Sequence, residues 1–145
     1  MGHTWKVSYV IKKQRRLIST MAEGRVGFAD IRDHQDRLLA DPDFDPTFDQ
    51  LIDTIPATKF DISAEEARIL AQRQVVSSAS RRAFVAVKPH IFGLARMMEI
   101  YHEALGYADA AVFYSMDEAL KWLERGEEKE GGQADPSEGP VNKRH

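Results

Sequence analysis

The sequence contains no cysteine among its 145 residues. That absence excludes disulfide bonds, thiolate metal sites and cysteine nucleophiles together, and it is typical of proteins in a reducing compartment. No apolar run approaches the roughly 18–20 residues that a membrane-spanning helix needs. The first ten residues, MGHTWKVSYV, also lack the long apolar segment of a secretion signal. We therefore expect a cytoplasmic protein without a membrane span, stabilised by packing alone.

Catalytic and cofactor-binding motifs are also missing. The sequence has no G-x-S-x-G, no phosphate-binding P-loop, no H-E-x-x-H and no G-x-G-x-x-G. His90 lies near an expected helix start, where a charged imidazole is disfavoured, and His102 falls on an apolar helix face. Both histidines are better explained by packing than by catalysis. We expect a protein that is not an enzyme, with no catalytic residue and no cofactor.

A metal site is not expected either. The stretch DPDFD at residues 41–45 has acidic residues at alternate positions, as calcium-binding loops do. A calcium loop of the EF-hand type requires glycine at its sixth position and glutamate at its twelfth, where this chain has Pro46 and Ile52. The aspartates and prolines are therefore interpreted as turn formers.

The composition predicts one domain with an uneven charge. A chain with 43% hydrophobic and 30% charged residues suits a single core. Residues 1–25 carry six basic side chains and one acidic one, whereas residues 30–66 carry three basic and eleven acidic ones. The basic cluster is small and lacks interleaved aromatics, so nucleic-acid binding is not expected. From residue 126 the composition predicts a disordered acidic and polar tail over 126–145, after a domain over 1–125.

Periodicity predicts strands that alternate with helices. Two alternating segments, 5–12 and 17–23, are interpreted as a β-hairpin. Short apolar runs predict further strands within 48–55, 82–87 and 110–114. Helical spacing predicts helices over 28–40, 63–76, 90–105 and from about residue 115. This order implies an α/β domain with a mostly parallel sheet of about five strands, in which the first strand is antiparallel, and about four helices.

The segment from Phe48 to Val76 combines a buried strand with a capped helix. Ser63 and Glu66 fit the capping-box pattern, in which the serine hydroxyl and the glutamate carboxylate each bond a free amide of the first turn. A strand end meets a helix start here, and ligands and regulatory chemistry often lie at such places in α/β domains.

Three long phrases carry a resemblance to a known superfamily. They are LLADPDFDPTFDQLIDTIPATKFDISAEEARILAQ, RRAFVAVKPHIFGLARMMEIY and VFYSMDEALKWL. These phrases are similar to those of the uncharacterised bacterial branch of the SpoIIAA-like superfamily, which also holds the STAS domains. The resemblance covers residues 5–124, and it implies a domain built from successive turns of a β-α superhelix.

The resemblance implies a regulatory domain that acts through protein contacts. In anti-sigma-factor antagonists of this superfamily, a kinase phosphorylates a serine in a D-S-S-G-like motif at a helix start. Here Asp61-Ile62-Ser63-Ala64 matches that motif at Asp61 and Ser63 and differs at the other two positions. A kinase or an anti-sigma-like regulator would then be the partner, and Ser63 the phosphosite. The alternative interpretation is that Ser63 only caps the helix.

The rival hypothesis is a small-molecule or lipid-binding module, since the same superhelix resembles the CRAL–TRIO lipid-transfer fold. The sequence feature that favours it is a helix rich in methionine and aromatic residues. Its candidate ligand face comprises Phe92, Met97, Met98 and Tyr101, more than a narrow core stripe needs. Such a face can equally belong to the core or mediate a homodimer.

Overall fold

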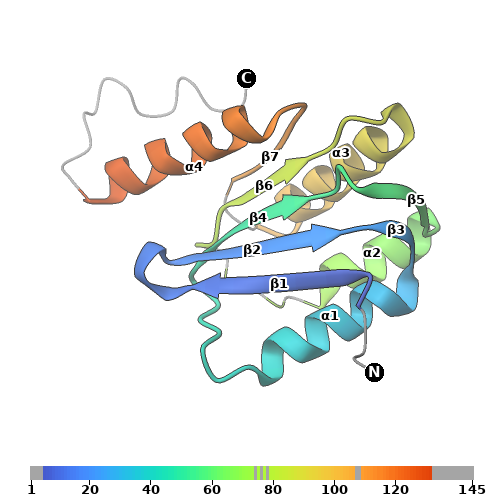
Figure 1. The fold of residues 1–145 in the computed structure, drawn as a ribbon, viewed down its shortest axis with the longest axis horizontal. Helices are drawn as coiled ribbons and strands as arrows, with labels where there is room; N and C mark the ends of the chain where they lie inside the picture. Colours follow the sequence, from blue (N-terminus) through green and yellow to red (C-terminus); the bar gives the residue numbers. More distant parts are fainter. Residues whose placement is uncertain (1–4, 74, 76, 78, 107–108, 132–145) are drawn as a thin grey trace.

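The main sheet has five strands in the order β1-β2-β4-β6-β7 (Figure 1). The computed structural model describes residues 5–131, apart from residues 74, 76, 78, 107 and 108. The strands are β1 (Val7–Lys12), β2 (Leu17–Ala22), β4 (Asp49–Asp53), β6 (Arg82–Val85) and β7 (Ala110–Phe113). Strands β1 and β2 pair antiparallel and all other neighbours pair parallel. The predicted hairpin and mostly parallel sheet are therefore confirmed.

Helices cover the sheet unequally. Helices α1 (Phe28–Ala40), α2 (Ala64–Gln72) and α3 (Pro89–Ala104) lie on one face, and α4 (Met116–Gly131) lies on the other (Figure 1). Two residues of α4, Ala119 and Leu123, form one core cluster with Leu17, Leu51 and Ala83 of the sheet. Other core clusters lie on the opposite face, against α1 and α3. The prediction of four helices is confirmed.

Strand alternation decides which side chains meet the three helices. Successive residues of a strand point to opposite faces, so Leu17 faces α4 while Thr20 faces α1. In β4, Leu51 likewise faces α4, whereas Gln50 and Ile52 face the other helices. The face under α1–α3 thus receives polar as well as apolar side chains.

A second, two-stranded sheet was not predicted. Strands β3 (Gly24–Gly27) and β5 (Ala57–Asp61) pair in parallel, just beyond the ends of β2 and β4 (Figure 1). The sequence pattern predicts no regular structure in either segment, and that prediction is wrong. Each strand is short, and their pairing joins segments that lie about 30 residues apart, so no local pattern reports it.

Helix α4 extends beyond the predicted end of the domain. The backbone of α4 continues to Gly131, beyond the predicted domain end at residue 125. Residues 132–145 lie outside the described part, and disorder there stays a prediction. Among the described residues, no helix has the length and apolar character needed to cross a bilayer.

Candidate functional site

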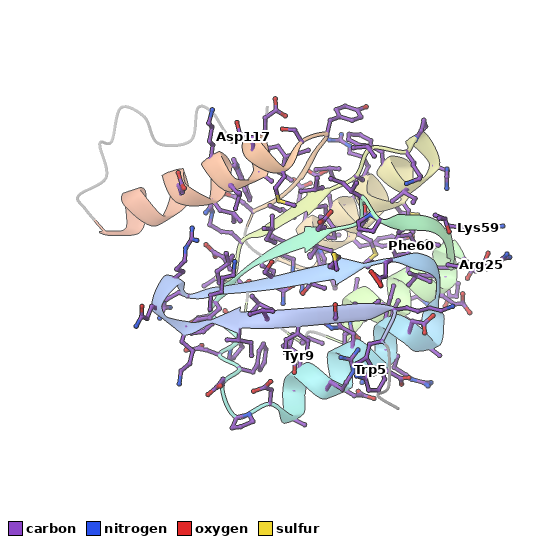
Figure 2. The ribbon with its side chains drawn as sticks, viewed as in Figure 1. Trp5, Tyr9, Arg25, Lys59, Phe60 and Asp117 are labelled. Carbon is purple, nitrogen blue, oxygen red and sulfur yellow. The ribbon has the colours of Figure 1, made fainter. Side chains whose placement is uncertain are left out.

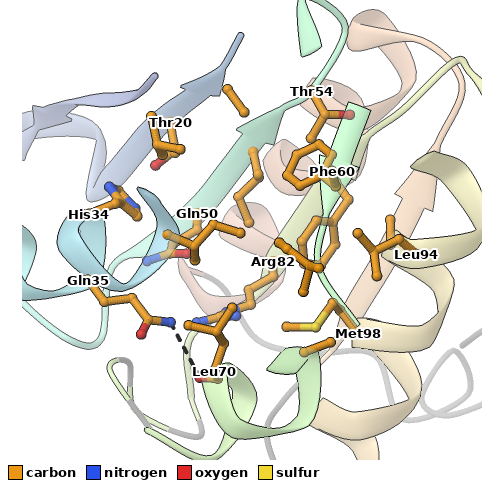
Figure 3. A pocket seen from close by; sticks show the side chains of 18 of the residues that line it. Thr20, His34, Gln35, Gln50, Thr54, Phe60, Leu70, Arg82, Leu94 and Met98 are labelled. Atoms are coloured by element: carbon orange, nitrogen blue, oxygen red, sulfur yellow. Dashed lines mark hydrogen bonds between the residues drawn. The ribbon is translucent and has the colours of Figure 1, made fainter. Parts of the chain in front are cut away.

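A cavity of about 130 Å³ lies between the main sheet and helices α1, α2 and α3 (Figure 3). Strands of both sheets and all three helices contribute to its wall, which is mostly apolar. The larger apolar side chains of the wall include Ile31, Ile52, Phe60, Phe84, Leu94 and Met98. Ile52 is only half-buried although β4 is the central strand, because the cavity lies over it.

Polar groups gather at one end of the cavity. Figure 3 shows Thr20, His34 and Gln50 at that end, and Leu94 and Met98 at the other. Thr20, His34 and Gln50 are 3%, 8% and 5% exposed. The half-buried Arg82 lies between the two ends, and it is the register partner of Gln50 on the neighbouring strand.

Some polar atoms at this end have no hydrogen-bond partner within the described part of the chain. Gln35, by contrast, is satisfied, because its amide donates to Leu70 O at 3.3 Å and its oxygen accepts from Arg73 at 3.0 Å. Thr20 Oγ1 and His34 Nδ1 are without a partner among the described residues. A buried polar group in this state costs about 1–3 kcal/mol, so it marks a position where a ligand group would be favoured.

The electrostatics of the cavity are set by Arg82. Its Nη1 donates to His102 Nε2 at 2.7 Å, so His102 is neutral and carries its proton on Nδ1. Burial, followed by the charge of Arg82, lowers the pKa of His102 from 6.5 to about 3. Burial, followed by the charges of Arg37 and Arg82, lowers the pKa of His34 from 6.5 to about 4. At neutral pH the cavity wall therefore contains the positive guanidinium of Arg82 and the neutral imidazole of His34. The neutral imidazole of His102 is not part of the wall but accepts a hydrogen bond from that guanidinium.

Metal-binding side chains do not cluster among the described residues. Among the side chains that the structure describes, no three histidine or acidic residues form a group that could hold a metal ion. The donors that do converge, a hydroxyl, an amide, an imidazole and a guanidinium, suit an organic ligand better.

Ser63 has the capping geometry that the sequence predicts. Its Oγ accepts from the amide of Glu66 at 3.0 Å, and the Glu66 carboxylate accepts from the amide of Ser63 at 3.0 Å. Asp61 is held by two basic residues instead, Arg25 and Lys59, which lie together at one end of the molecule (Figure 2). The hydrogen bond from Arg25 lowers the pKa of Asp61 below its usual value. The phosphosite remains a prediction.

The predicted ligand face on α3 is divided in the structure. Of its four residues only Met98 lines the cavity. Phe92 stacks on Tyr114 with a centroid distance of 4.3 Å, and Met97 and Tyr101 are half-buried outside the lining. The side of α3 that faces the sheet is instead formed by Ile91, Leu94, Ala95, Met98 and His102.

The polar residues of the cavity were not singled out from the sequence, although a signal exists. His34 lies three residues after Ile31 and four before Leu38, on the apolar face of α1. Gln50 and Arg82 alternate with residues that face α4. A polar residue at an inward-facing position is the signal that would have found them.

Comparisons with known proteins support the fold. No protein-family model matches the chain, and no curated protein matches it either. Among solved structures, an uncharacterized protein of the DUF3478 family with a SpoIIAA-like fold, from Shewanella loihica, is similar. The TM-score is 0.56 at 15% sequence identity, and the match covers 85% of this chain and 98% of that chain. Likeness at this identity defines a fold and not an activity. The chain has a SpoIIAA-like fold, as the resemblance in its sequence predicted.

Proposed function

We propose that the chain is a non-enzymatic binding module that holds a small molecule between its main sheet and α1–α3. The observation that carries this proposal is the cavity itself, whose apolar wall and few convergent polar groups are the usual composition of a ligand site. An engineered cavity of about 150 Å³ binds benzene, so an occupant of roughly six to eight non-hydrogen atoms suits a cavity of about 130 Å³. A long acyl chain would not fit.

The two histidines in and beside the cavity wall, His34 and His102, support binding rather than catalysis. A general base works best when its pKa lies near the working pH. The pKa of His34 is lowered to about 4 and that of His102 to about 3, so both are weak bases at neutral pH. We therefore propose that the polar end positions a ligand and does not transform it.

Filling the cavity should abolish binding. Met98→Trp places a larger side chain in the cavity, whereas Met97→Trp changes the neighbouring residue, which does not line it. Native mass spectrometry of protein purified without detergent should show a small bound adduct in the parent protein and in Met97→Trp, and none in Met98→Trp. An adduct that persists in Met98→Trp, or a bare protein mass in all three samples, would contradict the proposal. Thermal unfolding of each variant verifies that it is folded.

A second candidate function is regulation through Ser63, with a kinase or an anti-sigma-like regulator as the partner. Ser63 is exposed at the start of α2, and Phe60, Ile62 and Ala67 around it line the cavity. A phosphate there would interact favourably with the helix dipole but would be repelled by the neighbouring carboxylates of Glu65 and Glu66. A change at this helix end would reach the cavity wall directly, so the two functions can act together.

Substitutions at Ser63 separate the capping role from the regulatory one. Ser63→Ala should lower the free energy of unfolding by about 1 kcal/mol, whereas Ser63→Asp should lower it less because aspartate also caps helices. Urea unfolding of the two variants measures this difference. If both variants capture the same partners from native lysate as the parent protein, the switch hypothesis is wrong and Ser63 is a cap alone.

A further inference from the structure

We infer that the cavity selects a small carboxylate with a short apolar tail or ring, whose carboxylate lies against Thr20, His34, Gln50 and Arg82. This inference rests on the proposed function and names its class of ligand. The observation that carries the inference is that one end of the cavity is polar and the other end is apolar (Figure 3).

The first observation is the pair of unsatisfied buried atoms. Thr20 Oγ1 and His34 Nδ1 come from β2 and α1, two separate elements, and both side chains are more than nine-tenths buried. A hydroxyl can donate a hydrogen bond, and so can a neutral imidazole whose proton is on Nδ1. A carboxylate accepts through two oxygens, so a single group on the ligand can satisfy donors from both elements.

The second observation is the sign of the charge. Arg82 cannot lose its proton, and its charge helps to keep His34 and His102 neutral. A guanidinium binds carboxylates by charge-assisted hydrogen bonds, which are stronger than neutral ones. Gln50, the register partner of Arg82, can add a further amide donor. A ligand with an amine in this position would instead be repelled.

The third observation is the apolar end of the cavity, which limits the size and polarity of the part of the ligand beyond its carboxylate. Phe60 from β5 and Leu94 and Met98 from α3 form this end. Methionine is flexible and adapts to irregular shapes, so the end accepts either a short chain or a ring. The volume of about 130 Å³ leaves room for a short tail only.

Isothermal titration calorimetry at pH 7 with hexanoate, 1-hexanol and hexylamine tests the inference. These probes each contain six carbon atoms and differ in the charge and hydrogen-bonding of one end. The apolar tail of hexanoate is one carbon shorter than that of the other two, so any preference for hexanoate comes from its carboxylate. We expect hexanoate to bind at least about tenfold more tightly than 1-hexanol, and hexylamine not to bind at all. Toluene, which has no polar group, measures the apolar end alone.

Two variants test whether the carboxylate of the ligand binds at the polar end of the cavity. Thr20→Val removes the hydroxyl with little change of shape, and it should lower the affinity for hexanoate at least about fivefold relative to the affinity for toluene. Arg82→Gln should remove the preference for hexanoate over 1-hexanol. The matched control is Arg68→Gln, which removes a half-buried arginine of α2 that does not line the cavity. In this variant hexanoate should bind as tightly as in the parent protein and should still be preferred over 1-hexanol.

A failure of the carboxylate inference and a failure of the proposed function give different experimental results. Equal binding of hexanoate and 1-hexanol, lost together in Met98→Trp, would overturn the carboxylate inference and leave the proposed function standing. Unchanged hexanoate affinity in Thr20→Val would overturn it as well, even if Arg82→Gln does not fold. If neither toluene nor any of the three six-carbon probes binds the parent protein, the proposed function fails and the inference fails with it.

Discussion

Lowering the pH from 7 to 5 should destabilise the folded protein by about 4 kcal/mol, because two buried histidines resist protonation. The pKa values of His34 and His102 are about 4 and about 3 in the folded chain, against 6.5 for an ordinary histidine. As the pH falls through 6.5, the unfolded chain binds protons that the folded chain does not, so the unfolded state is favoured. Each histidine contributes about 2 kcal/mol to the loss over this range.

Between pH 7 and pH 5 the change in stability comes from the histidines and not from the carboxylates. Asp41, Asp45 and Asp61 have pKa values held below 3.8 by hydrogen bonds, so the stability that they contribute is lost only at lower pH. Urea unfolding at pH 7, 6 and 5 measures the effect. His34→Gln and His102→Gln should each reduce the pH dependence by about half. Equal stability of the parent protein at pH 7 and pH 5 would show that these imidazoles are not kept neutral by the fold.

Replacing Arg81 with methionine should lower the free energy of unfolding by about 3 kcal/mol. The Arg81 side chain is only 11% exposed and holds α4 against the sheet. It donates to Trp122 O at 2.9 Å and to Leu123 O at 3.2 Å, and its guanidinium lies 4.2 Å from the centre of the Trp122 ring. It also forms an ion pair with Asp49 at 3.6 Å. Methionine fills similar space but leaves these acceptors and the half-buried carboxylate of Asp49 without the arginine.

A double-variant cycle with Asp49→Asn separates the ion pair from the contacts to α4. Because Arg81 and Asp49 interact directly, the double variant should cost less than the sum of the two single variants. Arg68→Gln, which removes an exposed ion pair with Glu65, should have a much smaller effect. If Arg81→Met is as stable as Arg68→Gln in urea unfolding, Arg81 does not anchor α4.

The elements of the main sheet could be predicted because their patterns are local. Alternating apolar residues mark β1 and β2, and the spacing in residues 28–40 marks α1. Strands β3 and β5 could not be predicted in this way. Two of the four residues of β3 are glycines, and three of the five residues of β5 are exposed, so neither has an apolar pattern of its own. Their stability comes from pairing with each other across the sequence.

The cavity could be predicted only in part. Met98 stands out as an extra methionine on an apolar helix, and it does line the cavity. Gln50 lies inside an apolar run, and whether it faces a helix or a cavity depends on which helices cover that face of the sheet. Its position beside Arg82 depends in turn on β4 and β6 being neighbours, although they are about 30 residues apart in the chain. Strand order is a property of the whole fold and not of a local pattern.

The central claim is that the cavity under α1–α3 holds a small molecule, and nuclear magnetic resonance of the methionine methyl groups tests it most directly. The chain has five methionines, and Met97 and Met98 are adjacent on α3 but only Met98 lines the cavity. On titration with toluene, the methyl signal of Met98 should shift and saturate while that of Met97 changes little. If the Met98 signal does not move, or if both signals drift together without saturation, no molecule enters the cavity and the claim is wrong.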